Sequence, residues 1–130
     1  MSFYRQKHNV QFLVRVRDRI YSKCVGSDTG SGCFLWQGCT QNGYGKLSVV
    51  DPETGYPMTL KVHRAIYFIV NNLEYLSEDD CISHLCGIKN CVKSSHLIIE
   101  PIVVNVQRNN CFEQKKCFGH INSPNCIIEK

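Results

Sequence analysis

Apolar residues recur every four positions near the start of the chain. In residues 8–23, HNVQFLVRVRDRIYSK, this spacing puts Phe12, Val16 and Ile20 on one stripe of a helix, with arginines around it. The pattern therefore predicts a basic N-terminal helix. The segment GSDTGSGC follows; it is rich in glycine and serine and lacks periodicity, so we expect a turn-rich connector.

Three short stretches after the connector are typical of strands: CFLWQG, YGKLSVV and MTLKVHR. The last two are separated by DPETGYP, whose Asp-Pro, Thr-Gly and Tyr-Pro steps favour turns. This arrangement predicts an antiparallel β-ribbon. Helical spacing returns in RAIYFIVNNL, which we expect to end near Asn71, and in EPIVVNVQRNN, where Pro101 suits a first helical turn. The tail from Cys111 onwards has little periodicity and predicts a compact loop.

The length and the cysteine content limit the type of protein. A chain of 130 residues fits one domain with a modest core, and its nine cysteines suggest additional cross-links. There is neither a signal-peptide pattern nor an apolar run long enough to span a membrane, so we expect an intracellular protein. Thiols in a reducing compartment favour metal, and an odd cysteine count fits complete disulfide pairing poorly. Zinc is therefore the expected cross-link, and disulfides are the alternative if the chain is exported.

The charge permits a polyanionic partner without requiring one. The net charge is +4, and Asp18 is the only acid among the first 23 residues, which carry six basic side chains. A solvated helix face is the commoner meaning of such a run. Contact with phosphates is the functional alternative.

Two groups of cysteine and histidine have spacings compatible with metal binding. The first group is C-x4-C-x4-H and the second is C-x5-C-x2-H-x5-C; their members are Cys86, Cys91 and His96, and Cys111, Cys117, His120 and Cys126. Zinc prefers four tetrahedral N or S ligands, so the second group is complete and the first needs one more. Spacing does not choose among the candidates, which are Cys24, Cys33, Cys39 and Cys81. A closed four-ligand zinc has no open position, so neither site would be the reactive centre.

His84 lies two residues before Cys86 on a strand-like segment and is left over from these groups. Because strand side chains alternate, His84 should not share the zinc of Cys86. A histidine with one ring nitrogen held by a carbonyl can act as a general base near neutral pH. A histidine that only packs is the commoner alternative.

A family resemblance begins at these residues. The His-Cys box homing endonucleases of the I-PpoI type resemble this chain in the run SHLC and then at Cys91, His96-Leu97, Glu100, Asn105, Arg108-Asn109 and Cys111. The wider HNH nucleases are similar at Cys33 to Trp36, Gly43-Tyr44-Gly45 and His63-Arg64. The resemblance covers about residues 33 to 126.

This resemblance implies an α+β, ββα-metal (His-Me finger) nuclease fold with an antiparallel β-ribbon and two structural zinc sites. Residues 1–130 would form one zinc-stabilised domain, with a basic helix in 1–23, the ribbon in 33–64, the catalytic ββα core in 81–110 and the second zinc loop in 111–126. Cys33 would complete the first zinc site.

The resemblance also implies the chemistry. The protein would be a metal-dependent DNA endonuclease that leaves 5′-phosphate and 3′-hydroxyl ends, with His84 as general base and Asn105 holding a catalytic Mg²⁺, for which other divalent cations can substitute. Lys46, Lys61 and Arg64 are candidates for DNA or phosphate contacts. The partner would be double-stranded DNA. The protein would act in the nucleus if its host is a eukaryote and in the cytoplasm otherwise.

Alternatives remain open. A non-catalytic zinc-stabilised DNA-binding module of the same fold, similar to the DNA-binding domain of Smad transcription factors, would not need both His84 and Asn105. A disulfide-stapled secreted domain would contain no zinc. Homing enzymes of this type dimerise through an extended C-terminal tail; this chain ends four residues after Cys126, so we do not expect that route to a dimer.

Overall fold

The computed structural model describes residues 3–5, 8–26 and 32–128. Within them are three α-helices and seven strands, with two 3-10 turns, Phe3–Arg5 and Ser94–His96. The helices are α1 (Val10–Tyr21), α2 (Val62–Val70) and α3 (Ile102–Gln114). The strands are β1 (Cys24–Gly26), β2 (Phe34–Trp36), β3 (Thr40–Gln41), β4 (Tyr44–Val50), β5 (Pro57–Lys61), β6 (Cys81–His84) and β7 (Leu97–Glu100). This composition confirms the α+β class.

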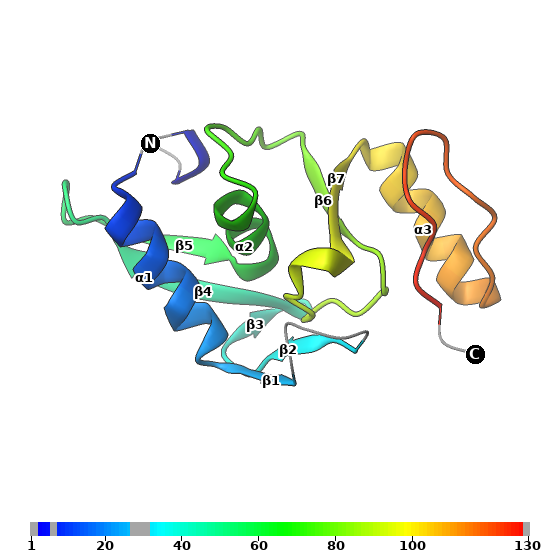
Figure 1. The fold of residues 1–130 in the computed structure, drawn as a ribbon, viewed down its shortest axis with the longest axis horizontal. Helices are drawn as coiled ribbons and strands as arrows, with labels where there is room; N and C mark the ends of the chain where they lie inside the picture. The colour runs from blue at the N-terminus through cyan, green and yellow to red at the C-terminus, as the bar shows by residue number, and fades with distance from the viewer. Residues whose placement is uncertain (1–2, 6–7, 27–31, 129–130) are drawn as a thin grey trace.

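All the strands pair antiparallel in three small sheets, β1–β2, β3–β4–β5 and β6–β7. The predicted ribbon is β4–β5, in which Lys46 lies opposite Lys61 and Val50 opposite Pro57. The pair β6–β7 leads directly into α3, so these three elements form a ββα unit. Figure 1 shows α3 and the chain after it at the end of the molecule away from α1 and the ribbon.

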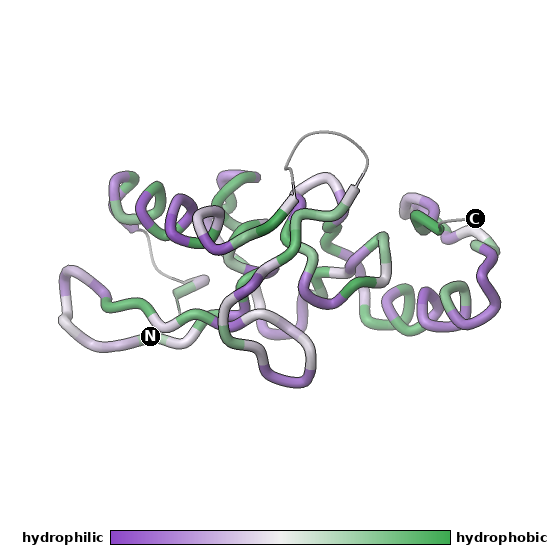
Figure 2. The backbone as a smooth tube through the Cα atoms, turned by 90° about the horizontal axis from the view of Figure 1, so that it is seen from below, coloured by the Kyte–Doolittle hydropathy of each residue, from purple (hydrophilic) through white to green (hydrophobic). Residues whose placement is uncertain are grey.

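Helix α1 follows the predicted stripe, because Phe12, Val16 and Ile20 are its buried residues. The side chain of Asn9 caps its start by accepting a 2.7 Å hydrogen bond from the backbone N–H of Gln11. The tube in Figure 2 alternates between apolar and polar colours along this helix. The helix therefore exposes its polar side and packs its apolar stripe inward.

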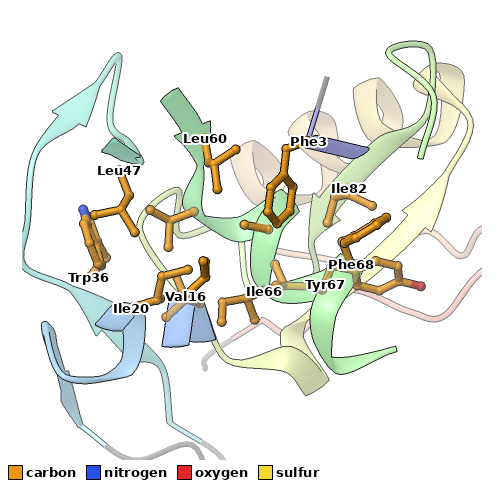
Figure 3. Packing of buried hydrophobic residues seen from close by; sticks show 14 of the residues in the cluster. Phe3, Val16, Ile20, Trp36, Leu47, Leu60, Ile66, Tyr67, Phe68 and Ile82 are labelled. Atoms are coloured by element: carbon orange, nitrogen blue, oxygen red, sulfur yellow. The ribbon is translucent and has the colours of Figure 1, made fainter. Parts of the chain in front are cut away.

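The core lies between α1, α2 and the inner face of the ribbon (Figure 3). Leu47 and Leu60 come from the ribbon, Ile20 from α1 and Ile66 from α2. Trp36 packs on the backbone at Gly45, where a Cβ atom would lie 2.7 Å from the indole ring. The glycine is therefore needed for this close approach.

The structure differs from the sequence-based expectation at three boundaries. The predicted strand MTLKVHR ends at Lys61, and its last three residues form the start of α2, where Val62 and His63 are buried. Strand β1 was not predicted; it lies between the predicted helix and the predicted connector and shares only Gly26 with the connector. Its backbone hydrogen bonds to β2 depend on a partner strand that a three-residue sequence pattern does not reveal. Helix α3 continues to Gln114, beyond the predicted end, and stops at Lys115, whose φ is +56°. Most of its side chains are exposed, so no apolar periodicity marks its end. Lys7 and residues 27–31 lie outside the described residues.

Within the described part of the chain, no helix combines the length and the apolar character needed to cross a membrane.

The position of Leu60 in the core gives a stability test. Leu60→Ala should lower the free energy of unfolding by about 2–5 kcal/mol, because the lost methyl groups leave a cavity. Val50→Ala is the matched control in the same ribbon, since Val50 is 60% exposed; its effect should stay within about 0.5 kcal/mol. Urea unfolding at a fixed zinc concentration measures both, and equal losses would contradict this account of the core.

Candidate functional site

The first metal-ligand group gathers segments that are far apart in the sequence. The ligand atoms of Cys33, Cys86, Cys91 and His96 lie within 4.8 Å of one another; we call this group the first tetrad. Backbone contacts bring Cys33 there, because Val92 N–H donates to Phe34 O at 2.8 Å and Leu35 bridges to Cys91. Of the four cysteines that spacing left open, Cys33 is the one that joins the group.

The other three cysteines lie elsewhere. Cys24 donates to the carbonyl oxygen of Ile20 at 3.2 Å, and burial raises the pKa of its thiol to about 11. Cys39 is exposed, and Cys81 is half-buried at the start of β6. No disulfide joins any two of the nine cysteines, all of which lie in the described part of the chain.

The second tetrad consists of Cys111 on α3 and Cys117, His120 and Cys126 in the loop that follows; again the ligand atoms lie within 4.8 Å of one another. His120 Nε2 is 3.6 Å from Cys111 Sγ and 3.4 Å from Cys126 Sγ. Its Nδ1 donates to Gln107 Oε1 at 3.1 Å, an outer contact that leaves Nε2 free to ligate.

Each tetrad offers three sulfurs and one imidazole nitrogen, which is a donor set of structural zinc. In the first tetrad, a hydrogen bond from the Cys86 thiol lowers the pKa of Cys91. A thiolate is the form of cysteine that ligates metal. Both tetrads are therefore consistent with zinc sites.

A cleft of about 300 Å³ lies beside the first tetrad, between β6, α3 and the ends of β4 and β5. Four of the residues predicted for the site line it: His84, Asn105, Lys61 and Arg64. Lys46 is not among its lining residues, although it lies opposite Lys61 on the ribbon. The fold thus brings His84 and Asn105 to one cavity.

His84 ends β6 and is 8% exposed. Its Nε2 lies 2.9 Å from the carbonyl oxygen of Cys91. A carbonyl can only accept, so Nε2 carries the proton and Nδ1 keeps its lone pair. Burial lowers the pKa of His84, an effect partly opposed by Cys91. At neutral pH the ring is neutral and can take a proton through Nδ1.

Two further rings stand beside His84. The ring centroids of His63 and His84 are 4.7 Å apart, and Tyr44 lies 5.3 Å from His63. His63 Nδ1 has no hydrogen-bond partner among the described residues, and burial, followed by the charge of His84, lowers the pKa of His63 to about 2. Sequence reasoning gave these rings no site role, and only the GYG and HR motifs could have signalled them.

Asn105 reaches the cleft from the first turns of α3. Its Nδ2 donates to Ser83 Oγ at 2.7 Å. Arg108 and Asn109 follow at helical spacings of three and four residues, so they share its side of the helix and also line the cleft. Arg108 forms a buried ion pair with Glu100 on β7, with both side chains at most 2% exposed.

The basic candidates differ in their surroundings. Arg64 donates to the carbonyl oxygens of Asp80 and Ser77, and its guanidinium stands 5.2 Å from the Tyr4 ring centroid. These contacts make Arg64 an anchor for the segment before β6. Lys61 and Lys46 are the two basic side chains that face each other across the ribbon.

The sequence was also compared with known proteins. A family model described as the zinc-binding loop region of homing endonuclease matches residues 37–128, most of the chain. The chain belongs to this homing endonuclease family. No curated protein and no solved structure gives a match.

Membership of the homing endonuclease family confirms the resemblance and the expected fold class, and it implies a DNA endonuclease. The match contains His84, Asn105 and seven of the eight tetrad residues; Cys33 lies just before it. In this family member, then, the first tetrad is completed by a residue outside the matched region.

The tetrads predict a metal count. Purified protein should carry two zinc ions per chain, and Cys117→Ser should carry one, because three remaining ligands leave the second site open. Hydrogen exchange in residues 111–126 should also become faster, since structural zinc contributes directly to folding. Cys39→Ser, which removes an exposed thiol outside both tetrads, is the control and should keep two. Native mass spectrometry gives the count, and two zincs on Cys117→Ser would refute the second site.

Proposed function

We propose that this protein is a metal-dependent DNA endonuclease that hydrolyses phosphodiester bonds to 5′-phosphate and 3′-hydroxyl ends. The observation that carries the proposal is the shared cleft, in which an imidazole with a free Nδ1 faces the same cavity as an amide side chain. Hydrolysis of a phosphodiester needs a base for the attacking water and compensation of charge on the phosphate. In this proposal His84 supplies the base, and Asn105 holds the cation that compensates the charge.

His84 acts as the general base in this proposal. Its Nε2–H is held by the Cys91 carbonyl, so the ring cannot turn away and Nδ1 takes the proton of the attacking water. Cys91 is itself a tetrad residue, so a zinc ion in the first tetrad would fix the carbonyl that orients His84. The first zinc would thus have a structural role that reaches the reactive group.

Asn105 is the proposed holder of the catalytic cation. Magnesium prefers oxygen ligands and keeps several waters, so one amide oxygen together with phosphate oxygens fits it. When bound, the cation supplies positive charge to the phosphate and to the leaving oxygen. The side chain of Asn105 suits this role because it lines the cleft and its nitrogen is already engaged by Ser83.

The ribbon is the proposed DNA contact. A two-stranded antiparallel ribbon fits the major groove of duplex DNA, while lysines bind phosphates. Lys46 and Lys61 are directly opposed, and like charges in that position repel unless an anion lies between them. Lys61 also lines the cleft, so it is the stronger candidate for the phosphate near the cut.

The first test is nicking of a supercoiled plasmid. Wild-type protein should nick it with added magnesium and not without, and His84→Ala should lower the rate by at least about 100-fold, the lower end of general-base effects. Omitting magnesium is the appropriate control, because a strong chelator would also remove zinc. His84→Ala should keep two zincs and the affinity for duplex DNA.

Two results would overturn the proposal. Wild-type protein that carries two zincs and binds DNA without nicking it would be the non-catalytic binding module. Magnesium-dependent nicking at the wild-type rate by His84→Ala would remove the histidine from the reaction.

A second test concerns the cation. Asn105→Ala should raise the magnesium concentration for half-maximal nicking by about tenfold or more, as loss of a metal-site partner does. Asn109→Ala is the matched control, since Asn109 is exposed and lines the same cleft one helical turn further on. An unchanged magnesium titration for Asn105→Ala would place the cation ligand elsewhere.

A further inference from the structure

A row of polar side chains runs from the second tetrad to the cleft. Arg108 donates to Cys126 Sγ at 3.2 Å and, through Nη2, to Glu100 Oε2 at 2.8 Å. The Ser83 hydroxyl lies close enough to the Glu100 carboxylate to lower its pKa. Asn105 Nδ2 completes the row at Ser83 Oγ, at 2.7 Å. The row joins α3, β7 and β6, and it ends on the residue proposed to hold the cation.

The charges in this row determine which groups can donate and which can accept. The Arg108 guanidinium can only donate, so Glu100 is held as an acceptor-only carboxylate. Burial alone would raise the pKa of Glu100, but the bonds from Arg108 and Ser83 bring it below its usual value, so the group stays ionised. The ionised carboxylate attracts the hydroxyl proton of Ser83, because a carboxylate can only accept. The Ser83 oxygen can then only accept from Asn105.

This arrangement selects one of two orientations of the Asn105 amide. With Oδ1 turned towards Ser83, two oxygens would face each other without a proton between them. With Nδ2 towards Ser83, one N–H is satisfied and Oδ1 lies on the opposite side of the amide. Among the described residues, no hydrogen bond is made to that oxygen, and Asn105 lines the cleft.

We propose that Ser83 is a positioning residue that turns the carbonyl oxygen of Asn105 towards the cleft, with the Glu100–Arg108 ion pair setting the direction of its hydroxyl. This inference rests on the proposed function, because it concerns the oxygen that would hold the cation. Ser83 has little freedom to move, because it is 1% exposed and its strand, β6, is paired with β7. Its role is to orient, and it does not touch substrate.

The chain offers a matched control for this role. The hydroxyl of Ser123, in the second zinc loop, also lowers the pKa of Glu100. Ser83→Ala and Ser123→Ala each remove one hydroxyl that acts on Glu100, but only Ser83→Ala removes the acceptor for Asn105. A difference between the two variants therefore reports on the amide and not on the stability of the carboxylate.

The first experiment titrates the cation. Ser83→Ala should raise the magnesium concentration for half-maximal nicking by about 3- to 10-fold, the scale of one lost hydrogen bond behind a ligand, with a maximal rate close to wild type. Ser123→Ala should match the wild-type midpoint. Binding of Mn²⁺ to complexes with duplex DNA, followed by electron paramagnetic resonance in the His84→Ala background, should shift by the same factor without any dependence on cleavage. Equal midpoints for Ser83→Ala and Ser123→Ala would overturn the proposal.

The second experiment uses the wild-type protein, so it does not depend on a variant that folds. In ¹H–¹⁵N spectra of the full chain, assigned with Asn105→Ala, one Nδ2 proton of Asn105 should exchange with water more slowly than those of the exposed Asn109. Exchange of both Nδ2 protons at the rate of Asn109 would overturn the proposed orientation. A wild-type protein that does not nick DNA but shows the protected proton would refute the nuclease function while keeping the amide geometry, so the two failures are distinguishable.

Discussion

The first tetrad connects the two halves of the chain, and the candidate active site depends on it. Cys33 precedes β2 near the ribbon, whereas Cys86, Cys91 and His96 belong to the segment that carries His84. The carbonyl of Cys91 accepts the Nε2 proton of His84. If the four ligands separated, this carbonyl would move and the ring would lose the contact that leaves Nδ1 free. Zinc bound to the first tetrad would thus set both the fold of a loop and the orientation of the proposed general base.

A buried ion pair plays the corresponding role on the other side of the cleft. Glu100 and Arg108 lie almost entirely out of water, and removing one partner of such a pair typically costs about 3–5 kcal/mol because the other charge stays buried. The pair joins β7 to α3 and, through Cys126, to the second tetrad. Helix α3 buries little apolar surface of its own, with Val104, Arg108 and Cys111 as its buried residues. Its position therefore depends on polar contacts and metal ligands more than on a hydrophobic face.

The apolar core and the cleft are thus built from different interactions. The core of α1, α2 and the ribbon is held by ordinary burial of side chains such as Ile20, Leu60 and Ile66. In the ββα unit, β6 and β7 add Ile82 and Leu97 to that core, whereas α3 is held largely by the second tetrad and the ion pair. This division suits a site whose polar groups must stay at the surface of a cleft, since a larger apolar core there would remove them from water and substrate.

Much of the local structure was predictable from the sequence. The stripe of Phe12, Val16 and Ile20 specified α1, because side chains four residues apart lie on one buried face only when the chain is helical. The turn chemistry of DPETGYP specified the ribbon. The second tetrad was complete in sequence because its ligands are neighbours in one loop. Family resemblance, rather than spacing, singled out Asn105 and Cys33 and gave His84 its role. In the structure His84 and Asn105 line one cleft, and Cys33 joins the first tetrad.

Other features were decided only when the chain folded. Strand β1 depends on backbone pairing with β2, and the end of α3 depends on contacts of Arg108 and Cys111 that have no periodic signal. The anchoring role of Arg64 became visible only through the carbonyls it meets. The row from Arg108 to Asn105 joins polar residues, and the sequence does not show which of them donates a hydrogen bond and which accepts it. Sequence by itself determined the local periods and the residue types available for chemistry, whereas the tertiary structure decided the partners, because hydrogen bonds and ligand geometry depend on distances between segments that sequence order does not contain.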